Sequence, residues 1–396
     1  MIKEVSIFEN DHQAGKFFPA FFISLKEAFV KIKHLLFIQI DLLACVKFQI
    51  IMKQFKKALA LACVVSATLV QPFPTSAQQK TGFHVLKDIK IASPGGWDYI
   101  TVDGADKKIY ASHGTQVNIL STTTGDSIGV ISNTNGVHGI ALAKPFGKGY
   151  TSNGRDNSCT AFDLKTNKAI ATIPAGTNPD AIFYDSFSKK VYAFNGRSQD
   201  ATVIDPATDK VVATIPLGAK PETGVSDGKG KIFVNAETTN EIVVIDANTY
   251  KILNRYKIEG GEEPTGLDID RATSRLFIGC GGNKTMVVMD AMNGKCLTKF
   301  SIGNCDGVAF DPQLKLAYCS NGDGTMSVIK EVSADQFEFI ESVPTELGAR
   351  TIGIDLTTHH LFLPTAQMEA VAPTAENAHP RPKMIPGTFH VVEVGK

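Results

Sequence analysis

Seven residues that could carry chemistry recur along this chain at intervals of 40 to 44 positions. Most of them are charged or can bind protons and cations: Asp98, His138, Asp180, Glu222, Thr265, Asp306 and Arg350. If they meet in space, the crowded carboxylates raise one another's pKa and attract a cation. Carboxylates beside a histidine can also act as general acids and bases. Whether they meet depends on the elements that carry them.

The interval matches a repeated unit, of which residues 176–218 are the clearest copy. This copy contains four short runs of β-branched and aromatic residues, each bounded by Gly, Pro, Asn or Asp: 181–184, 190–194, 201–204 and 210–215. Such punctuation is typical of strands joined by turns. Seven copies of four strands predict an all-β protein, a seven-bladed β-propeller of antiparallel blades that occupies residues 78–396 as one domain.

The seventh copy has no fourth strand before the chain ends. Its third strand, near residues 389–394, runs to the C-terminus, and an unassigned strand-like run at 85–91 precedes the first copy. A closed ring leaves no exposed sheet edge. We therefore predict that the N-terminal strand completes the last blade by pairing with residues 389–394.

In an antiparallel blade of this kind the first strand lines the central channel, so the seven recurring residues should surround one mouth of it. The second strands end on the same face and add four polar residues: His113, Asn153, Asn195 and Asn321. We predict that these positions together form a ligand-binding surface, because ligands favour concave sites with convergent polar groups. The alternative is that the channel mouth is polar only because it faces water, as in any propeller, and binds no ligand.

Two further features fall on this face. His113 and His138 could hold a metal ion together with Asp98, although no short ligand spacing supports a metal site. Residues 366–388 form a long connection with four prolines between the second and third strands of the seventh blade. Loops of this length are commonly binding lids or disordered insertions, and this one is expected to overhang the channel mouth.

Copies three and four carry the sequences TVIDPATDKVVATIPLG at 202–218 and EIVVIDANTYKI at 241–252. On these motifs the chain resembles the YVTN-repeat, YncE-like seven-bladed propellers, which are exported bacterial proteins, over about residues 83–396. The resemblance implies a propeller of WD40/YVTN-like repeats and export from the cytoplasm. It implies little about activity, because members of that family are mostly non-enzymatic or uncharacterised.

The N-terminal region is typical of a secretory signal peptide at residues 52–77. A basic start at 52–57 precedes an apolar run at 58–70 and the small residues 75–77, which place cleavage after Ala77. We expect translation to begin at Met52, so that residues 1–51 lie outside the protein; a genuine or disordered extension is the alternative. The mature chain would be exported to the periplasm or the extracellular medium, without a transmembrane segment.

The charge balance and the cysteine pattern argue against several classes of function. Residues 78–396 contain 31 basic and 35 acidic residues, a balance of about −4 that argues against general binding to a phosphate backbone. Five cysteines follow residue 77, none in a CxxC pair, so neither a thioredoxin-like site nor attached haem is indicated. An odd number of cysteines leaves at least one thiol unpaired, and small apolar residues buried in strands are the favoured interpretation. No GxSxG, P-loop, HExxH or dinucleotide motif stands in a suitable context.

These observations favour an exported, non-catalytic binding or scaffold propeller, monomeric, that holds a small molecule or a protein partner at the channel mouth. No catalytic residue and no cofactor is assigned, and a divalent cation is the one candidate ion. The first alternative is a lactonase-like or metal-dependent hydrolase that uses the mouth carboxylates and His138 as acid and base. The second is binding to a nucleic acid or a cell-surface polymer, which the acidic balance disfavours.

Overall fold

A computed structural model describes residues 80–91, 93, 95–369, 371–372 and 383–396 of this chain. Contacts between Cα atoms group Gln78–Lys396 into one compact unit. The predicted signal peptide and residues 1–51 lie outside the described residues. In the part of the chain that is described, no helix has the length and apolar character needed to cross a membrane.

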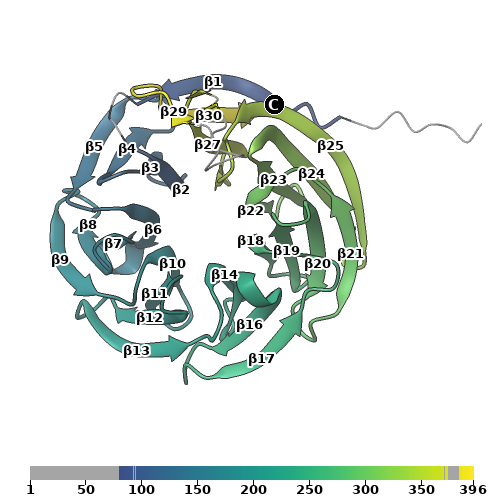
Figure 1. The fold of residues 1–396 in the computed structure, drawn as a ribbon, viewed down its shortest axis with the longest axis horizontal. Coiled ribbons are helices and arrows are strands. Elements are labelled where there is room, and N and C mark those ends of the chain that lie inside the picture. Colours follow the sequence, from purple (N-terminus) through teal and green to yellow (C-terminus); the bar gives the residue numbers. More distant parts are fainter. Residues whose placement is uncertain (1–79, 92, 94, 370, 373–382) are drawn as a thin grey trace, which may run out of the picture. The chain divides into compact units, whose positions relative to one another are not determined.

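Seven four-stranded antiparallel sheets stand around a central channel, with the first strand of each innermost (Figure 1). This arrangement confirms the predicted all-β, seven-bladed propeller. Blades one to three contain β2 (Trp97–Asp103), β3 (Lys108–His113), β4 (Gln116–Ser121), β5 (Ser127–Ser132), β6 (Val137–Ala143), β7 (Lys148–Asn153), β8 (Ser158–Asp163), β9 (Ala169–Pro174), β10 (Pro179–Asp185), β11 (Lys190–Asn195), β12 (Asp200–Asp205) and β13 (Lys210–Pro216).

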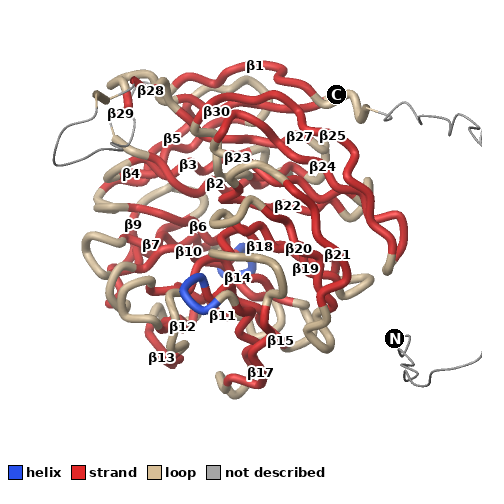
Figure 2. Tube along the Cα trace, turned by 45° about the vertical axis from the view of Figure 1, so that its right-hand side comes forward, coloured by secondary structure: helices blue, strands red, loops and turns tan. Residues whose placement is uncertain are grey.

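The remaining blades follow the same order along the chain. Blades four to six contain β14 (Pro221–Ser226), β15 (Lys231–Ala236), β16 (Glu241–Asp246), β17 (Ile252–Lys257), β18 (Pro264–Asp270), β19 (Arg275–Cys280), β20 (Thr285–Asp290), β21 (Cys296–Ser301), β22 (Cys305–Asp311), β23 (Leu316–Asn321), β24 (Asp323–Ser333) and β25 (Gln336–Leu347). Blade seven contains β26 (Gly353–Asp355), β27 (His360–Thr365), β30 (His390–Gly395) and β1 (His84–Lys90). Figure 2 shows how little helix interrupts the strands, namely the short 3-10 turns η1 (Lys144–Phe146) and η2 (Glu237–Thr239).

The strand that closes the ring comes from the opposite end of the described chain. In blade seven the strand order is β26-β27-β30-β1, and β1 pairs antiparallel with β30. The register places Val85 opposite Val394 and Ile89 opposite Val391. In Figure 1, β1 runs along the outer rim beside β30. The predicted pairing of residues 85–91 with 389–394 is therefore confirmed.

The core lies between neighbouring blades and is built largely by the second and third strands. The third residue of each second strand is aromatic and at most 1% exposed: Tyr110, Tyr150, Tyr192, Phe233, Phe277, Tyr318 and Phe362. Because each of these strands is covered on both faces, its residues are buried in succession rather than alternately. Burial of one such ring contributes about 1.5–3 kcal/mol, so the repeated aromatic position stabilises every contact between blades in the same way.

The turns between first and second strands explain the recurring aspartates. Asp185 is 1% exposed, and its carboxylate accepts hydrogen bonds from the backbone N–H and the hydroxyl of Ser188. It also accepts a hydrogen bond of 2.6 Å from the hydroxyl of Ser226 in the next blade. A carboxylate at this position therefore both forms the turn and joins two blades.

Two of the five cysteines are paired, a question that the sequence alone left open. Cys305 in β22 and Cys319 in β23 form a disulfide within blade six, with Cα atoms 6.0 Å apart. Adjacent antiparallel strands bring Cα atoms within disulfide reach, which a separation of 14 residues in the sequence did not reveal. Cys159 and Cys280 are buried thiols, as predicted, and Cys296 is partly buried.

The long connection in blade seven begins and ends as a short hairpin, β28 (Met368–Glu369) with β29 (Lys383–Met384). Met384 packs against the apolar cluster around Phe389. Figure 1 shows the hairpin over the outer part of the ring near β1. The prediction that this loop overhangs the mouth depends on its tip, residues 370 and 373–382, which lie outside the described residues.

We predict that Ile89→Ala lowers the free energy of unfolding by about 2–5 kcal/mol. Ile89 is 4% exposed and belongs to the same apolar cluster as Phe389 and Val391, so its removal leaves a cavity at the closing seam. Chemical denaturation followed by tryptophan fluorescence measures the change. Lys90→Ala, at an exposed position of the same strand, is the control and should change stability by less than about 0.5 kcal/mol. Equal effects of the two substitutions would contradict closure by packing of β1.

Candidate functional site

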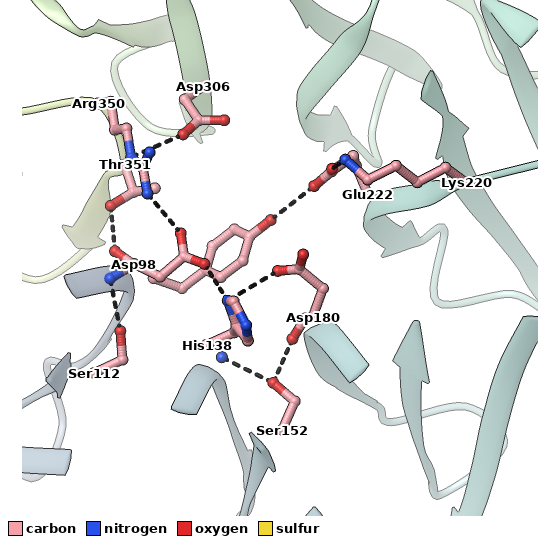
Figure 3. Close-up of polar contacts among 12 residues, drawn as sticks. Asp98, Ser112, His138, Ser152, Asp180, Lys220, Glu222, Asp306, Arg350 and Thr351 are labelled. Atoms are coloured by element: carbon pink, nitrogen blue, oxygen red, sulfur yellow. Dashed lines mark hydrogen bonds and ion pairs between the residues drawn. The ribbon is translucent and has the colours of Figure 1, made fainter. Parts of the chain in front are cut away.

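The recurring residues stand at one end of the channel. Six of them occupy the second position of an innermost strand: Asp98, His138, Asp180, Glu222, Thr265 and Asp306. Arg350 lies just before β26. Figure 3 shows that all of these except Thr265, which is not drawn as a labelled residue, point toward a common space. We call Asp98, His138, Asp180, Glu222, Asp306 and Arg350 the channel-mouth cluster.

His138 lies between two carboxylates of this cluster. Its Nδ1 is 2.6 Å from Oδ2 of Asp98 and 3.5 Å from Oδ1 of Asp180. The imidazole is 28% exposed, whereas the side chains of Asp98 and Asp180 are 17% and 14% exposed. The Nδ1 hydrogen is therefore donated to Asp98, and this contact holds the imidazole in one orientation.

Two basic side chains face the carboxylates. Nη2 of Arg350 lies 3.5 Å from Oδ1 of Asp98, and its Nε lies 3.2 Å from Oδ2 of Asp306. On blade four, the ammonium group of Lys220 pairs with Glu222 (Figure 3). The cluster therefore contains four carboxylates against two fixed positive charges.

Tyr99, which was not predicted as a site residue, lies directly behind the cluster. It follows Asp98 in β2, at a position where the other blades carry small residues: Gly139, Ala181, Thr223, Gly266, Gly307 and Thr351. Its ring reaches from blade one to the apolar cluster between blades three and four, and its hydroxyl lies 3.5 Å from Oε2 of Glu222. One large residue at a position that is small in six other copies is the signal that could have identified it.

A cavity of about 140 Å³ lies beside Tyr99 in the channel. First-strand residues of blades one to four line it, including Ile140, Ile182 and Phe183. A space of this size holds only a few water molecules, and most of its lining is apolar. A charged ligand would therefore be recognised at the mouth rather than in this cavity.

Side chains of one blade hold the backbone of the mouth residues in the next blade. In each case a hydroxyl or amide donates to a backbone carbonyl oxygen across the blade boundary: Ser152 to Asp180, Ser320 to Arg350, Thr351 to Asp98, and Asn235 to Thr265. A hydrogen bond of this kind contributes about 1 kcal/mol, and here it also positions the Cα atom from which the functional side chain projects. Spacing in the sequence gave no sign of these contacts.

The four residues at the ends of the second strands do not join the mouth. Each is at most 1% exposed: His113, Asn153, Asn195 and Asn321. The amide groups of the three asparagines donate to hydroxyl groups on the neighbouring strand, as Asn153 does to Thr160 at 2.8 Å. Their predicted place on the binding surface is therefore corrected, because they turn into their blades to satisfy buried polar groups. Thr265 likewise donates its hydroxyl to the carbonyl oxygen of Cys305 at 2.9 Å.

His113 uses both ring nitrogens within its own blade. Nδ1 lies 2.7 Å from the hydroxyl of Ser93, and Nε2 lies 2.8 Å from the carbonyl oxygen of Gly95. Burial lowers the pKa of His113. It is therefore not free to share a metal ion with His138. The described residues instead bring three other ligand atoms within 4.8 Å of one another, those of Asp98, His138 and Asp180.

Burial and mutual repulsion shift the ionisation of the cluster. Burial, and then the charge of Asp98, raises the pKa of Asp180 to about 7. Burial, and then the charge of Asp180, raises the pKa of Glu222 to about 9. Burial also raises the pKa of Asp306 to about 6, although the neighbouring guanidinium opposes this. For His138, burial opposes protonation, but the hydrogen bond to Asp98 and the charge of Asp180 outweigh it, so its pKa is raised.

Comparison with known proteins adds information about the fold alone. No family model and no curated protein matches this sequence. Hydrazine synthase of Kuenenia stuttgartiensis is similar in structure with a TM-score of 0.62 at 15% identity, over 72% of this chain and 95% of that chain. U3-55K and the RRP9 WD40 repeats have TM-scores of 0.65 and 0.66, each at 9% identity over 78% of this chain and 98% of theirs. These similarities support the propeller fold.

We predict that the wild-type protein loses stability relative to Asp180→Asn as the pH rises from about 4 to about 7. The folded-state pKa of Asp180, about 7, exceeds the usual carboxyl value of about 3.9. The folded protein therefore holds a proton that the unfolded chain has released. The neutral carboxyl group stabilises the fold fully at acid pH, and this contribution falls by at most about 1.4 kcal/mol per pH unit.

Thermal denaturation of both proteins at about pH 5 and about pH 8 measures this difference. Asp126→Asn, at an exposed turn position, is the matched control. Its stability relative to the wild type should be the same at both pH values. A difference for Asp180→Asn that also stays constant with pH would show that the carboxyl group of Asp180 ionises normally in the folded protein.

Proposed function

We propose that this protein is an exported binding propeller that holds a cationic ligand at the mouth of its channel. The observation that carries the proposal is the excess of carboxyl groups over fixed positive charges at the channel mouth. The four carboxyl groups of the channel-mouth cluster face two fixed positive charges, Arg350 of the cluster and the neighbouring Lys220. Carboxyl groups whose pKa is raised by neighbouring carboxylates are those that an added cation would stabilise.

The ligand must carry positive charge, because on binding it would replace the protons held by Asp180 and Glu222. Near neutral pH, Asp180 and Glu222 retain protons because their pKa values are raised to about 7 and about 9. Glu222 is only 8% exposed, so an ion pair formed there is weakly screened by solvent. An organic ammonium group and a divalent metal ion share this chemistry. The metal ion would use the ligand atoms of Asp98, His138 and Asp180.

The cellular setting is proposed from the sequence. The signal-peptide pattern at 52–77 and the resemblance to YVTN-repeat propellers over about 83–396 both favour export to the periplasm or the extracellular medium. We propose that the protein acts there as a monomer.

We predict that the protein binds putrescine or Mn²⁺ more tightly at about pH 8 than at about pH 6, because the cation displaces protons from Asp180 and Glu222. Release of one proton per cation changes the affinity by at most about tenfold per pH unit. Isothermal titration calorimetry with each probe alone measures the affinity and shows whether the site prefers an ammonium group or a metal ion.

Substitution of the cluster residues tests whether the cation binds at the channel mouth. Asp180→Asn combined with Glu222→Gln should weaken binding at least about tenfold, the equivalent of 1.4 kcal/mol. Asp126→Asn removes an exposed carboxylate in a turn of blade one and should leave the affinity unchanged. Unchanged binding in the double variant, or no binding of either probe to the wild type, contradicts the proposal.

The contact between Asp98 and His138 favours one further candidate function, hydrolysis of a lactone-like ester. In this arrangement the carboxylate orients the imidazole, and Nε2 could accept a proton from an attacking water molecule. Nε2 lies close to Gly154, where an added Cβ would be 2.6 Å from it, so the glycine leaves space there. Binding to a nucleic acid gains no support, because negative charge predominates at the mouth.

For this candidate we expect gluconolactone hydrolysis above the rate in buffer, with a loss of at least about tenfold in His138→Gln. The pH of the reaction mixture, followed with an indicator, measures the rate. Asp126→Asn is again the control. Wild-type protein that does not exceed the buffer rate would exclude this reaction and leave the binding proposal standing.

A further inference from the structure

A second group of metal-type ligands lies at the seam where the ring closes. It consists of Asp88 on the closing strand β1, Glu346 near the end of β25 and His390 at the start of β30. One ligand atom of each lies within 4.8 Å of the other two. We call these three residues the seam cluster. They come from three strands that meet only when β1 completes blade seven beside blade six.

The hydrogen bonds of His390 determine which of its nitrogens carries hydrogen. Its side chain is 9% exposed, and Nδ1 lies 2.8 Å from the carbonyl oxygen of Thr388, outside the seam cluster. A carbonyl oxygen can only accept, so Nδ1 is the donor. Nε2 is thereby directed at Glu346 and lies 2.9 Å from its Oε2, a carboxylate oxygen that only accepts.

The positive species between Nε2 and Oε2 is a proton or a metal ion. A proton would join His390 to Glu346 only. A metal ion would also use the second carboxylate, Asp88, because one ligand atom of each of the three residues lies within 4.8 Å of the other two. Donor atoms that lie about 2.0–2.2 Å from one tetrahedral ion are about 3.3–3.6 Å apart, so the separation of 2.9 Å between Nε2 and Oε2 would widen by about 0.5 Å when the ion binds.

We propose that the seam cluster binds a divalent transition-metal ion, for which Zn²⁺ is the best match. One imidazole nitrogen and two carboxylate oxygens suit Zn²⁺, with water in the remaining position. Ca²⁺ and Mg²⁺ prefer oxygen ligands throughout. The carbonyl oxygen of Thr388 takes the part of the group that commonly orients a metal-bound histidine. Glu346 is 38% exposed and Asp88 is exposed, so the ion can enter from solvent.

The consequence is a link between metal binding and closure of the ring. The ion joins β1 to blades six and seven, and its ligands converge only in the closed ring. Because binding to the folded state alone stabilises that state, removal of the ion should loosen β1. The seam cluster is separate from the channel mouth and does not depend on the function proposed there.

Cobalt substitution tests the proposal on tag-free protein from which metals have been removed with EDTA. We expect wild-type protein to bind Co²⁺ at the seam cluster with visible d–d absorption, which Zn²⁺ abolishes by displacement. His390→Gln and, separately, Asp88→Asn should each weaken this binding at least about tenfold. Asp88 is exposed, so its substitution leaves the packing of the core intact. Asp126→Asn, an exposed carboxylate outside both clusters, is the matched control and should bind Co²⁺ as the wild type does, whereas His138→Gln reports separately on an ion at the channel mouth.

Three results would overturn the proposal. The first is a wild type that does not bind Co²⁺, which would show that a proton, and not a metal ion, lies between His390 and Glu346. Binding that is lost in His138→Gln but kept in Asp88→Asn places the ion at the channel mouth. Binding that is lost in His390→Gln but kept in Asp88→Asn excludes the three-ligand site.

Discussion

Six of the seven blades take four consecutive strands from one stretch of the chain, whereas blade seven takes β26, β27 and β30 from the C-terminal part and β1 from the beginning of the described unit. Pairing of β1 with β30 satisfies the backbone groups that would otherwise form an open edge. It also brings blade seven against blade one, where the hydroxyl of Thr351 donates to the carbonyl oxygen of Asp98. Residues 40 to 44 positions apart thereby become neighbours at one end of the channel.

The electrostatics of the mouth follow from this closed geometry. Each carboxylate is placed by its own blade and cannot move far from the next one, because hydrogen bonds such as that from Ser152 to Asp180 tie the blades together. Tyr99 fills space across the channel, which limits the water that could solvate the charges. Burial is accordingly the largest cause of the raised pKa of Asp180, of Glu222 and of Asp306. The ionisation of the site is therefore a property of the ring more than of any one residue.

Spacing in the sequence was sufficient to predict the blades, their closure and the seven positions at the mouth, because a repeat period reports the length of chain between equivalent turns. The direction of a side chain at the end of a strand does not follow from spacing. Asn153 turns into its blade because a buried polar strand offers it Thr160 as a partner. The Cys305–Cys319 disulfide depends on which positions of two strands meet, and Tyr99 is conspicuous only when the same position is compared across all blades.

His138 and His390 are two of the histidines of this ring that lie beside carboxylates, yet their hydrogen bonds give them different capacities. Nδ1 of His138 faces Asp98 and Asp180, so its hydrogen is shared with negative groups and the ring is suited to hold or exchange a proton. Nδ1 of His390 instead donates to a backbone carbonyl, which directs Nε2 at Glu346. A histidine oriented in this way by a backbone carbonyl resembles the histidines that bind metal ions. The backbone around each ring, and not the residue types, separates these two chemistries.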